Sequence, residues 1–392
     1  MFEVNAGSGG SVGSVALVRE AVEGIFNWLK RFIYVQDERD LYILALWIFA
    51  SHVAKELFTS PRLLIDSPLP ASGKTTLLEH IHRLAKDPVQ MANISSPAML
   101  GRITAKGIRT LLLDEIDRSL DPKRPGVQDL IALLNTGYKV GGTRPVLVAN
   151  GKDWDVVEMP SFAPVAMAGN TPNLPDDTRS RCIVIRLLPD NSGQAQESDW
   201  EQLDIWALQL KEQIVAAAES VRELVAEIKP SLPKGCVNRF REKWKPLKRI
   251  SVLVGKDWEE RVDSYIVNDI ETIKEQSENG DSRISLHHQL LKDLWDVFEG
   301  ERKFKSTESI IWALIKLNPD SWSDTGYGGK AITPKRLSIL LNGKFGLLSQ
   351  RVDGVRGYTS TQFVKLWQGF SIGTLKQPAE PAEPAKPAGE VF

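Results

Sequence analysis

The sequence predicts an α/β fold in which a parallel β-sheet carries a phosphate-binding loop. Three observations predict it. An apolar run at 63–65 leads into Ser67-Pro-Leu-Pro-Ala-Ser-Gly-Lys-Thr-Thr76, and a helix-compatible segment follows. A second run at 110–117, Thr-Leu-Leu-Leu-Asp-Glu-Ile-Asp, is aliphatic and ends in carboxylates, which is typical of a buried parallel strand. Between 61 and 190, short apolar strands alternate with helical segments, the pattern of a sheet flanked by helices.

The first segment has the residue types that a phosphate-binding loop needs. Small residues let successive backbone N–H groups curve around an anion, and Gly73 permits its close approach. Lys74 would reach the terminal phosphates, and the Thr75 hydroxyl would hold Mg²⁺ at the positive end of the next helix. Pro68 replaces the first glycine of G-x-x-x-x-G-K-[ST], and an ordinary strand-to-helix turn is the alternative. The residues predicted to bind the nucleotide are Pro70, Ala71, Ser72, Gly73, Lys74, Thr75 and Thr76.

The second run has the form of a Walker B strand. Ligands of open α/β sheets gather at the carboxyl ends of the strands, so Asp114 would lie beside the loop and organise the metal. Glu115 would polarise a water molecule for attack on the γ-phosphate, since phosphoryl transfer depends mostly on positioning and electrostatics. ATP and Mg²⁺ are therefore the predicted cofactors. The alternative is a core strand capped by solvated acids.

Length and composition agree with a multidomain globular protein. The 392 residues exceed what one core usually spans, which predicts two or three domains. Hydrophobic residues make up 42% and charged residues 25%, and the net charge of -1 leaves nucleic-acid contacts to local basic patches. Cys182, Cys236 and the five histidines show no zinc spacing, and His80 is expected on a helix surface.

No targeting segment or membrane span is expected. The stretch from Leu41 to Phe58 is too short to cross a bilayer and contains charged residues, so it predicts a buried helix. The few thiols fit a reducing compartment, which predicts a cytoplasmic location without a membrane partner.

Changes in pattern divide the chain into six parts. They are a flexible head (1–13), N-terminal helices (14–60), a P-loop core (61–190), a helical lid (191–280), a compact unit (283–371) and a Pro/Ala/Glu tail (372–392) that cannot build a core.

Two further segments complete the core. Ala163 to Asn170 is a small, apolar strand that ends in an amide, and Leu174 to Leu187 places Arg179 and Arg181 before a final strand. This order resembles the AAA+ family. The resemblance implies that Asn170 helps to hold the attacking water and that Arg181, or Arg179, completes the site of a neighbouring subunit. A turn residue and solvated arginines are the alternatives.

A second resemblance covers about residues 20 to 371. It is carried by Leu46-Trp-Ile-Phe, Ser60-Pro-Arg-Leu-Leu-Ile, Asn135-Thr-Gly-Tyr-Lys, Arg239-Phe-Arg-Glu-Lys-Trp with Gly255-Lys-Asp-Trp, and Gly357-Tyr358. The pattern is similar to an uncharacterised family of bacterial and phage proteins associated with primase-polymerases. It implies an AAA+-like helicase of mobile-element replication in the bacterial cytoplasm, assembled as a homo-oligomer, a hexameric ring, with a primase or polymerase as a possible partner. The chain departs from the pattern at Pro68 and in having no primase domain.

The resemblance also implies one residue in the lid. Arg239 occupies the place where AAA+ proteins put a sensor 2 arginine that touches the γ-phosphate, and Arg241 or Lys243 would be its substitutes. A salt-bridged helix surface is the alternative.

A hairpin is predicted before the strand that ends at Asn170. Strand-like residues flank Asn150-Gly151, the strongest short hairpin signal. In superfamily three helicases a hairpin at this place lines the pore, which would give Lys152 a grip on the nucleic-acid backbone, with Lys139 and Arg144 as weaker candidates. Asp153 and Asp155 argue against a strongly basic tip. The alternative is a surface hairpin whose lysine protects an edge.

The compact unit predicts a winged helix. Helix-compatible stretches at 284–299, 306–316 and 333–342 precede a hairpin-like segment at 347–359. Lys335 and Arg336 on the third helix and Arg351 and Arg356 on the wing would then face DNA. Protein contacts or solvated charges are the alternatives. The residues Trp295, Trp312, Trp322 and Trp367 are expected in its core.

Together these features predict a ring-forming, ATP- and Mg²⁺-dependent motor on single-stranded or forked DNA. Two other classes stay open: a non-motor DNA-binding loader or initiator switched by ATP, and an ATP-driven protein remodeller.

Overall fold

The computed structural model describes residues 10–92, 97–121, 124, 126–150, 153–278, 286–323, 331–370 and 372–373. They form two compact units that divide between Thr272 and Ile273. The elements of the first unit are α1 (Gly10–Phe32), α2 (Arg39–His52), α3 (Ala54–Leu57), β1 (Arg62–Ser67), α4 (Lys74–Leu84), β2 (Pro88–Met91), α5 (Pro97–Ala105), β3 (Thr110–Leu113), α6 (Ile116–Ser119), α7 (Val127–Thr136), β4 (Thr143–Asn150), β5 (Asp153–Pro160), β6 (Val165–Asn170), α8 (Asp176–Arg179), β7 (Cys182–Arg186), α9 (Trp200–Ser220), α10 (Arg222–Glu227), α11 (Asn238–Val254) and α12 (Lys256–Glu278), whose end passes the boundary. Those of the second unit are α13 (Leu286–Phe298), β8 (Phe304–Ser306), α14 (Thr307–Leu317), α15 (Pro319–Trp322), α16 (Pro334–Phe345), β9 (Gln350–Val352), β10 (Val355–Thr359), η1 (Ser360–Phe363) and α17 (Val364–Gly369).

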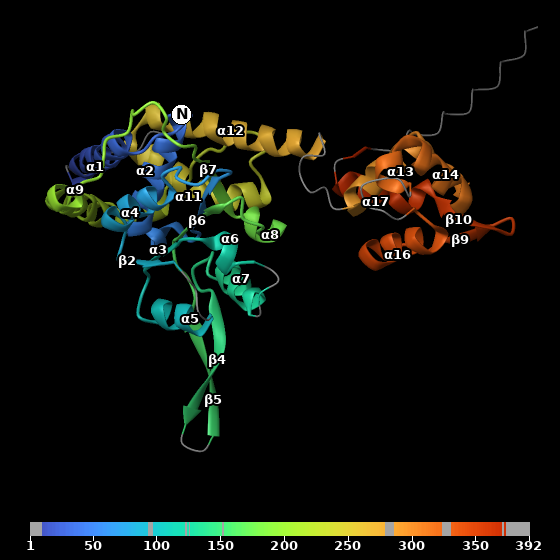
Figure 1. Cartoon of the computed structure of the whole chain (residues 1–392), viewed down its shortest axis with the longest axis horizontal. Helices are drawn as coiled ribbons and strands as arrows, with labels where there is room; N and C mark the ends of the chain where they lie inside the picture. The colour runs from blue at the N-terminus through green and yellow to red at the C-terminus, as the bar shows by residue number, and fades with distance from the viewer. Residues whose placement is uncertain are drawn as a thin grey trace, which may run out of the picture. The chain divides into compact units, whose positions relative to one another are not determined.

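The first unit is built on a five-stranded sheet in the order β2-β3-β6-β1-β7 (Figure 1). All neighbouring strands are parallel, which confirms the predicted α/β class with a parallel sheet and is compatible with a P-loop fold. We call the side where these strands begin the amino edge and the side where they end the carboxyl edge. Strand β1 lies between β6 and β7, and all six of its residues are buried.

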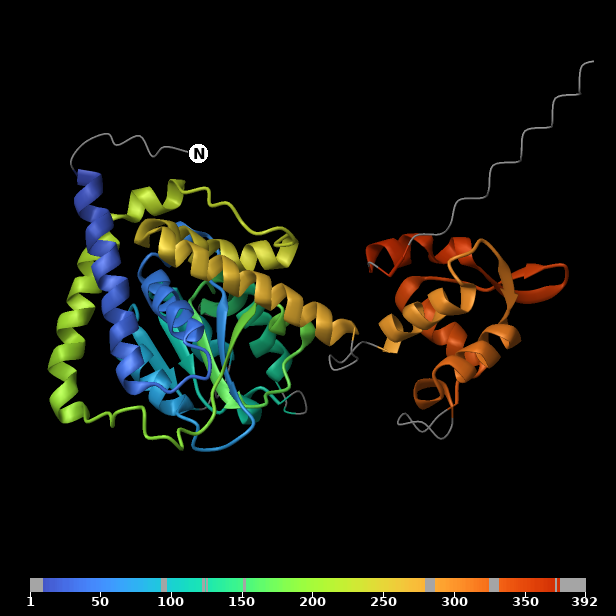
Figure 2. The ribbon, with the colours of Figure 1, turned by 90° about the horizontal axis from the view of Figure 1, so that it is seen from above.

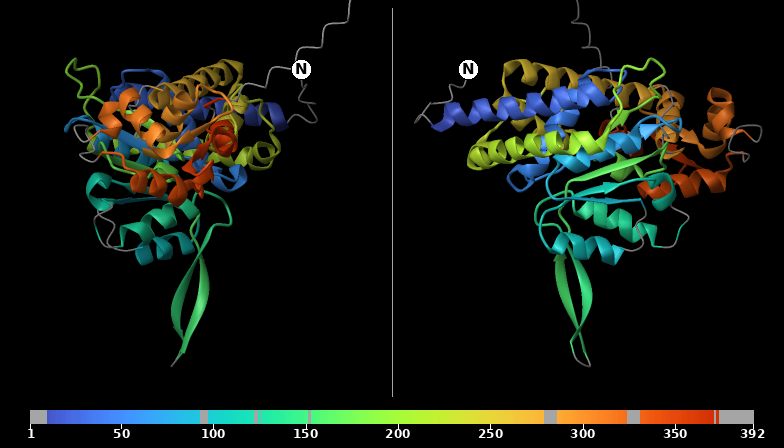
Figure 3. Two further views of the ribbon diagram at one scale, coloured as in Figure 1. Left: turned by 90° about the vertical axis from the view of Figure 1, so that its right-hand side faces the viewer. Right: turned by 60° about the vertical axis from the view of Figure 1, so that its left-hand side comes forward.

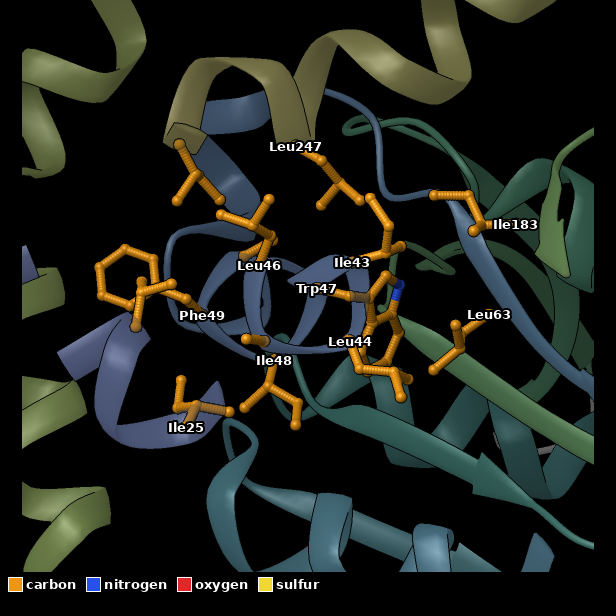
Figure 4. Close-up of a cluster of buried hydrophobic side chains, with 14 of the residues drawn as sticks. Ile25, Ile43, Leu44, Leu46, Trp47, Ile48, Phe49, Leu63, Ile183 and Leu247 are labelled. Carbon is orange, nitrogen blue, oxygen red and sulfur yellow. The ribbon is translucent and has the colours of Figure 1, made fainter. Parts of the chain in front are cut away.

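Helices cover both faces of this sheet. Successive residues of a strand point to opposite faces, and accordingly Leu63 and Ile65 pack with α1, α2 and α11, whereas Leu64 packs with α5, α6 and α7. Figure 4 shows Trp47 of α2 against Leu63, and the Trp47 indole donates a hydrogen bond of 2.8 Å to the Pro61 carbonyl. Helices α1 and α9 run side by side at the flank of the unit (Figure 2). The buried helix predicted from Leu41 to Phe58 is confirmed as far as His52, where α2 ends. The separate short helix α3 follows, and Phe58 is 60% exposed.

The predicted hairpin is confirmed as β4 and β5. The two strands pair antiparallel from Thr143 with Pro160 to Asn150 with Asp153, and the hairpin projects from the rest of its unit (Figure 3). Its connecting residues Gly151 and Lys152 lie outside the described residues, so the predicted contact residue Lys152 is not placed.

The second unit contains the three helices and the hairpin that the sequence predicts. Strands β8, β10 and β9 form an antiparallel sheet beside α13, α14 and α16, while the winged-helix assignment stays a prediction. Trp322 and Trp367 are fully buried and Trp295 is partly buried, as expected. Trp312 was expected in the core, and that is wrong: it is 66% exposed because it lies on the face of α14 opposite to buried Ile310.

Two other expectations change or stay open. His80 is buried rather than on a surface, because the Trp28 indole donates to its Nδ1 over 2.9 Å and Phe32 stacks on its ring.

Helix α1 begins at Gly10, inside the segment expected to be a flexible head, and residues 1–9 and 374–392 lie outside the described ranges. The boundaries predicted between the six parts of the chain remain predictions. No helix within the described ranges is long and apolar enough to cross a membrane.

Two buried histidines predict how stability responds to pH. Burial lowers the pKa of His52 to about 4 and that of His80 to about 3, from 6.5. Below pH 6.5 these histidines are protonated in the unfolded chain but stay neutral in the folded protein. For each histidine, the free energy of unfolding should therefore fall by about 1.4 kcal/mol for every unit by which the pH is lowered. Asp40, whose pKa burial raises to about 6, opposes part of this loss because it takes up a proton in the folded state.

We therefore expect the free energy of unfolding, measured by urea titration, to fall between pH 6.5 and pH 4. The double variant His52→Gln, His80→Gln should be less stable at pH 7 and should show a flatter or reversed slope. His82→Gln, at a partly exposed position, is the matched control and should keep most of the slope. Equal slopes in the double variant and the wild type would contradict this account.

Candidate nucleotide-binding site

The segment that joins β1 to α4 forms a turn, and at one position its backbone has a conformation that favours glycine. Gly73 has a φ of +80°, in the left-handed region, so any side chain there would be strained. The Lys74 ammonium donates to the Leu69 carbonyl (3.2 Å) and to Ser72 Oγ (2.9 Å), so the lysine folds back over the loop. The N–H groups in the first turn of α4 have no partners within the helix, which makes this terminus suited to an anion.

One hydrogen bond joins the two predicted motifs. The Thr75 hydroxyl, on α4, donates to Asp114 Oδ2 over 3.0 Å, although β6 lies between the strands that lead to them. The other oxygen of Asp114 accepts from the Glu115 amide at 2.8 Å. A hydroxyl and a carboxylate are hard oxygen ligands, and Mg²⁺ usually takes one or two such protein ligands together with substrate phosphates. The donor set therefore fits the predicted metal.

Glu115 and Asn170 lie at the same carboxyl edge. Glu115 has a φ of +49° just after β3, and its carboxylate pairs with Arg118 at 3.1 Å, where both side chains are more than half exposed. Asn170 ends β6 opposite Ser67, the last residue of β1, and its backbone N–H donates to Asp117 Oδ1 over 3.0 Å. Gly169 makes this approach possible, since a Cβ there would lie 2.9 Å from Asp117 and from Ile116.

The charges around Lys74 support an electrostatic role. Burial lowers the pKa of Lys74, and the carboxylates of Asp114, Asp117 and Asp66 act in the opposite direction. These acids therefore surround the ammonium closely enough to influence it. In a site with one lysine and several carboxylates, a bound divalent cation would be stabilising, because its charge would offset the repulsion among the carboxylates.

A hollow of about 620 Å³ opens beside the loop, within the volume range of small-ligand sites. Residues 71–76 form one side, and the other comes from the end of α1 and the segment after β7. Sequence reasoning missed this second side, which includes Tyr34, Leu188 and Gln196. No motif marks these residues; only their position after an amphipathic helix and after the last strand could have indicated them.

Both candidate trans-acting arginines lie near the amino edge. Arg181 immediately precedes Cys182, the register partner of Arg62 at the start of β1, whereas the loop follows the end of β1. A six-residue strand is roughly 20 Å long, so Arg181 stands about that far from the loop of its own chain. Its side chain is 15% exposed and is held by the Asp177 carbonyl and the Tyr138 ring. Arg179, which is partly exposed, makes no ion pair within the described part of the chain.

Arg239 lies away from the loop of its own chain, and its predicted contact with the γ-phosphate stays a prediction. It lies near Glu242 (3.5 Å), whose backbone carbonyl accepts from the Thr59 hydroxyl just before β1. Arg239 also contributes to lowering the pKa of Arg181, although burial is the larger cause. The structure therefore places it at the amino edge, away from the loop of its own chain, because α11 begins there. The first proposed substitute, Arg241, is exposed on the same helix, and the second, Lys243, is buried in an ion pair with Asp269 at 2.7 Å.

The remaining nucleic-acid candidates are spread over both units. Lys139 is paired with Glu242 at 2.6 Å at the foot of the hairpin, and Arg144 lies in β4 opposite Met159. In the second unit Lys335 is exposed in the first turn of α16, where the Thr333 side chain accepts from the Arg336 amide. The residues Arg351 and Arg356 are both exposed and face each other across β9 and β10. Like charges directly opposite destabilise a strand pair, which an anion would relieve.

Comparison with known proteins gives two findings. Residues 194–370 match the family described as "Protein of unknown function (DUF3631)", a region that begins after the sheet and includes the whole second unit up to α17. Among solved structures, a full-length MCM homolog from Methanopyrus kandleri is similar at 13% identity with a TM-score of 0.42. That similarity covers 69% of this chain and 63% of the other. No curated protein matches the sequence.

The site predicts specific losses of nucleotide binding. Lys74→Ala removes a charge-assisted contact and should weaken binding of a fluorescent ATP analogue by about 10- to 100-fold. Thr75→Val keeps the shape of the side chain but removes its hydroxyl, so it should abolish most of the gain in affinity that Mg²⁺ gives. Lys256→Ala, at an exposed lysine side chain, is the control and should bind normally. Unchanged magnesium dependence in Thr75→Val would be evidence against the metal site.

Proposed function

We propose that this chain is an ATP- and Mg²⁺-dependent hydrolase that assembles into a ring and acts on DNA. The hydrogen bond between Thr75 and Asp114 carries the proposal, because it brings the phosphate-binding lysine, a metal-binding pair and two polar candidates for water activation to one edge of the sheet. Phosphoryl transfer requires little more than such positioning and charge.

Each residue of the site has one role in the proposed hydrolysis of ATP. Backbone N–H groups of 71–76 and the Lys74 ammonium bind the phosphates, and Thr75 and Asp114 hold the metal. Bound Mg²⁺ supplies neutralisation of the charge that develops on the phosphate oxygens. Glu115 accepts the proton of the attacking water, and Asn170 helps to orient that water. Tyr34 and Leu188 bind the base on the far side of the hollow.

The two edges of the sheet explain why the chain would assemble. Arg179 and Arg181 cannot reach the loop of their own chain, so they act only if the amino edge of one copy faces the carboxyl edge of another. Such a head-to-tail contact repeats from copy to copy and closes into a ring when the rotation permits. Arg179 is the first candidate because Arg181 is already engaged by Asp177 and Tyr138.

Two features support DNA as the polymer. The hairpin of β4 and β5 exposes Trp154, Leu147 and Val156 on one face, and aromatic rings stack on bases of any sequence. In the second unit, the opposed Arg351 and Arg356 offer a paired phosphate contact. Replication of a phage or other mobile element, and a primase or polymerase partner, belong to the same proposal through the family resemblance.

Mixing inactive variants tests the shared site. Lys74→Ala and Arg179→Ala should each hydrolyse ATP poorly alone, because one lacks the loop contact and the other the neighbour's arginine. When the two are mixed, some interfaces combine an intact loop with an intact arginine, so ATPase activity should recover to a measurable fraction of wild type. The same test with Arg181→Ala tells which arginine acts. No recovery with either arginine variant would contradict sharing between subunits.

DNA dependence separates the motor from its rivals. We expect single-stranded DNA to stimulate ATPase turnover several-fold, and Lys152→Ala and the double variant Arg351→Ala, Arg356→Ala to lose stimulation while basal turnover persists. Forked DNA should be unwound. Nucleotide-dependent assembly without unwinding would favour the loader or initiator, and turnover indifferent to DNA would favour the protein remodeller.

A further inference from the structure

A second hollow, of about 630 Å³, lies at the amino edge of β2 and β3, away from the loop site. Four segments that are distant in sequence converge on it: the α2–α3 junction, residues 86–88 at the start of β2, the turn at 106–109 before β3, and the neighbouring helices α9 and α10. Its lining is strongly cationic. The cations are Lys55, Lys86, Lys106, Arg109, Lys211 and Arg222, and Asp87 is the only carboxylate among the described lining residues.

Existing contacts use only part of this charge. Arg222 is committed to Glu56 (3.0 Å) and Glu219 (2.6 Å), and Lys86 approaches Asp87 at 3.4 Å. Arg109 donates only to backbone carbonyls. The other three cations, Lys55, Lys106 and Lys211, form no ion pair within the described residues. Since the whole chain has a net charge of -1, this concentration of unpaired positive charge is a local feature.

The concave shape strengthens the effect of the charges. A recess lined by one sign of charge focuses the field and raises the local concentration of counter-ions. Burial lowers the pKa of Lys211, as does the neighbouring Lys86 ammonium, whereas the Asp87 carboxylate raises it, so a further anion in the hollow would favour the charged lysine. Buried His52 at the rear already hydrogen-bonds the Leu84 carbonyl at 2.8 Å, so its ring is fixed as part of the wall.

We propose that this hollow is a second anion site, which binds a small ligand that carries two or more phosphate groups. Three lysines from three segments line the space, and a ligand with several phosphate groups offers negative charge to more than one of them. A nucleic-acid strand is less suited, because none of the described lining residues is Phe, Tyr or Trp and therefore no platform exists for a base. The site goes beyond the proposed function and does not depend on it.

The test uses the full chain with Lys74→Ala, in EDTA, so that the loop site contributes little. The probe is inorganic triphosphate, and its binding is measured by isothermal titration calorimetry. Inorganic monophosphate is measured in the same way as a second ligand. We expect triphosphate to bind at one site and monophosphate to bind at least about tenfold more weakly, since fewer charges are matched. Adding Lys106→Glu and Lys211→Glu should weaken triphosphate binding at least about tenfold.

Controls make each outcome decisive. Lys234→Glu changes the same charge at an exposed position outside the hollow and should leave binding within about twofold. The milder Lys106→Gln, Lys211→Gln pair, with thermal unfolding of every variant, separates lost binding from lost folding. Absence of triphosphate binding, an equal loss in Lys234→Glu, or binding of a single-stranded oligonucleotide with none of triphosphate would overturn the proposal. Because the Lys74→Ala substitution already disables the loop site, loss of triphosphate binding in this experiment is distinct from failure of the ATPase proposal.

Discussion

The arrangement of the first unit depends on the complete burial of β1 between two parallel neighbours. At its start, the buried Arg62 guanidinium donates to the carbonyls of Leu134 and Ala163 and lies 5.7 Å from the Tyr138 ring. At its end, Ser67 begins the candidate phosphate-binding loop. Because every strand of the sheet runs the same way, side chains at the start of β1 and side chains at its end lie at opposite edges of the sheet and do not meet within one chain. The edges therefore become separate surfaces.

Those two surfaces differ in their charged groups. The carboxyl edge gathers the acids near Lys74, whereas the amino edge carries arginines paired with Asp177 and Glu242 and, beside β2 and β3, the cationic hollow. The Tyr138 ring lies within 6 Å of both Arg62 and Arg181, so the arginine that follows α8 contacts the same ring as the arginine at the start of β1. The near-neutral total charge does not show how these groups are distributed, which only the fold reveals.

The sequence predicted what is local and missed what depends on helix packing. The loop, the strand before Asp114 and the hairpin are each specified within about ten residues by composition and turn chemistry, and the Thr75–Asp114 contact follows from the rule that strand ends meet. Arg239 was assigned by analogy, but the direction in which α11 crosses the unit decides its place. His80 looks like a surface residue until α1 and the segment near Ser198 close over it.

The pair between Glu115 and Arg118 limits how this site could be regulated. Both side chains are more than half exposed, and such pairs contribute about 0–1 kcal/mol. Binding of a nucleotide with its metal changes the local charge far more than that, so the pair cannot lock the site in an inactive state. It can only hold the Glu115 carboxylate in a defined place until a water competes for it. In the proposed ring, the arginine of a neighbouring copy is a group that the two-edged sheet leaves available to control turnover.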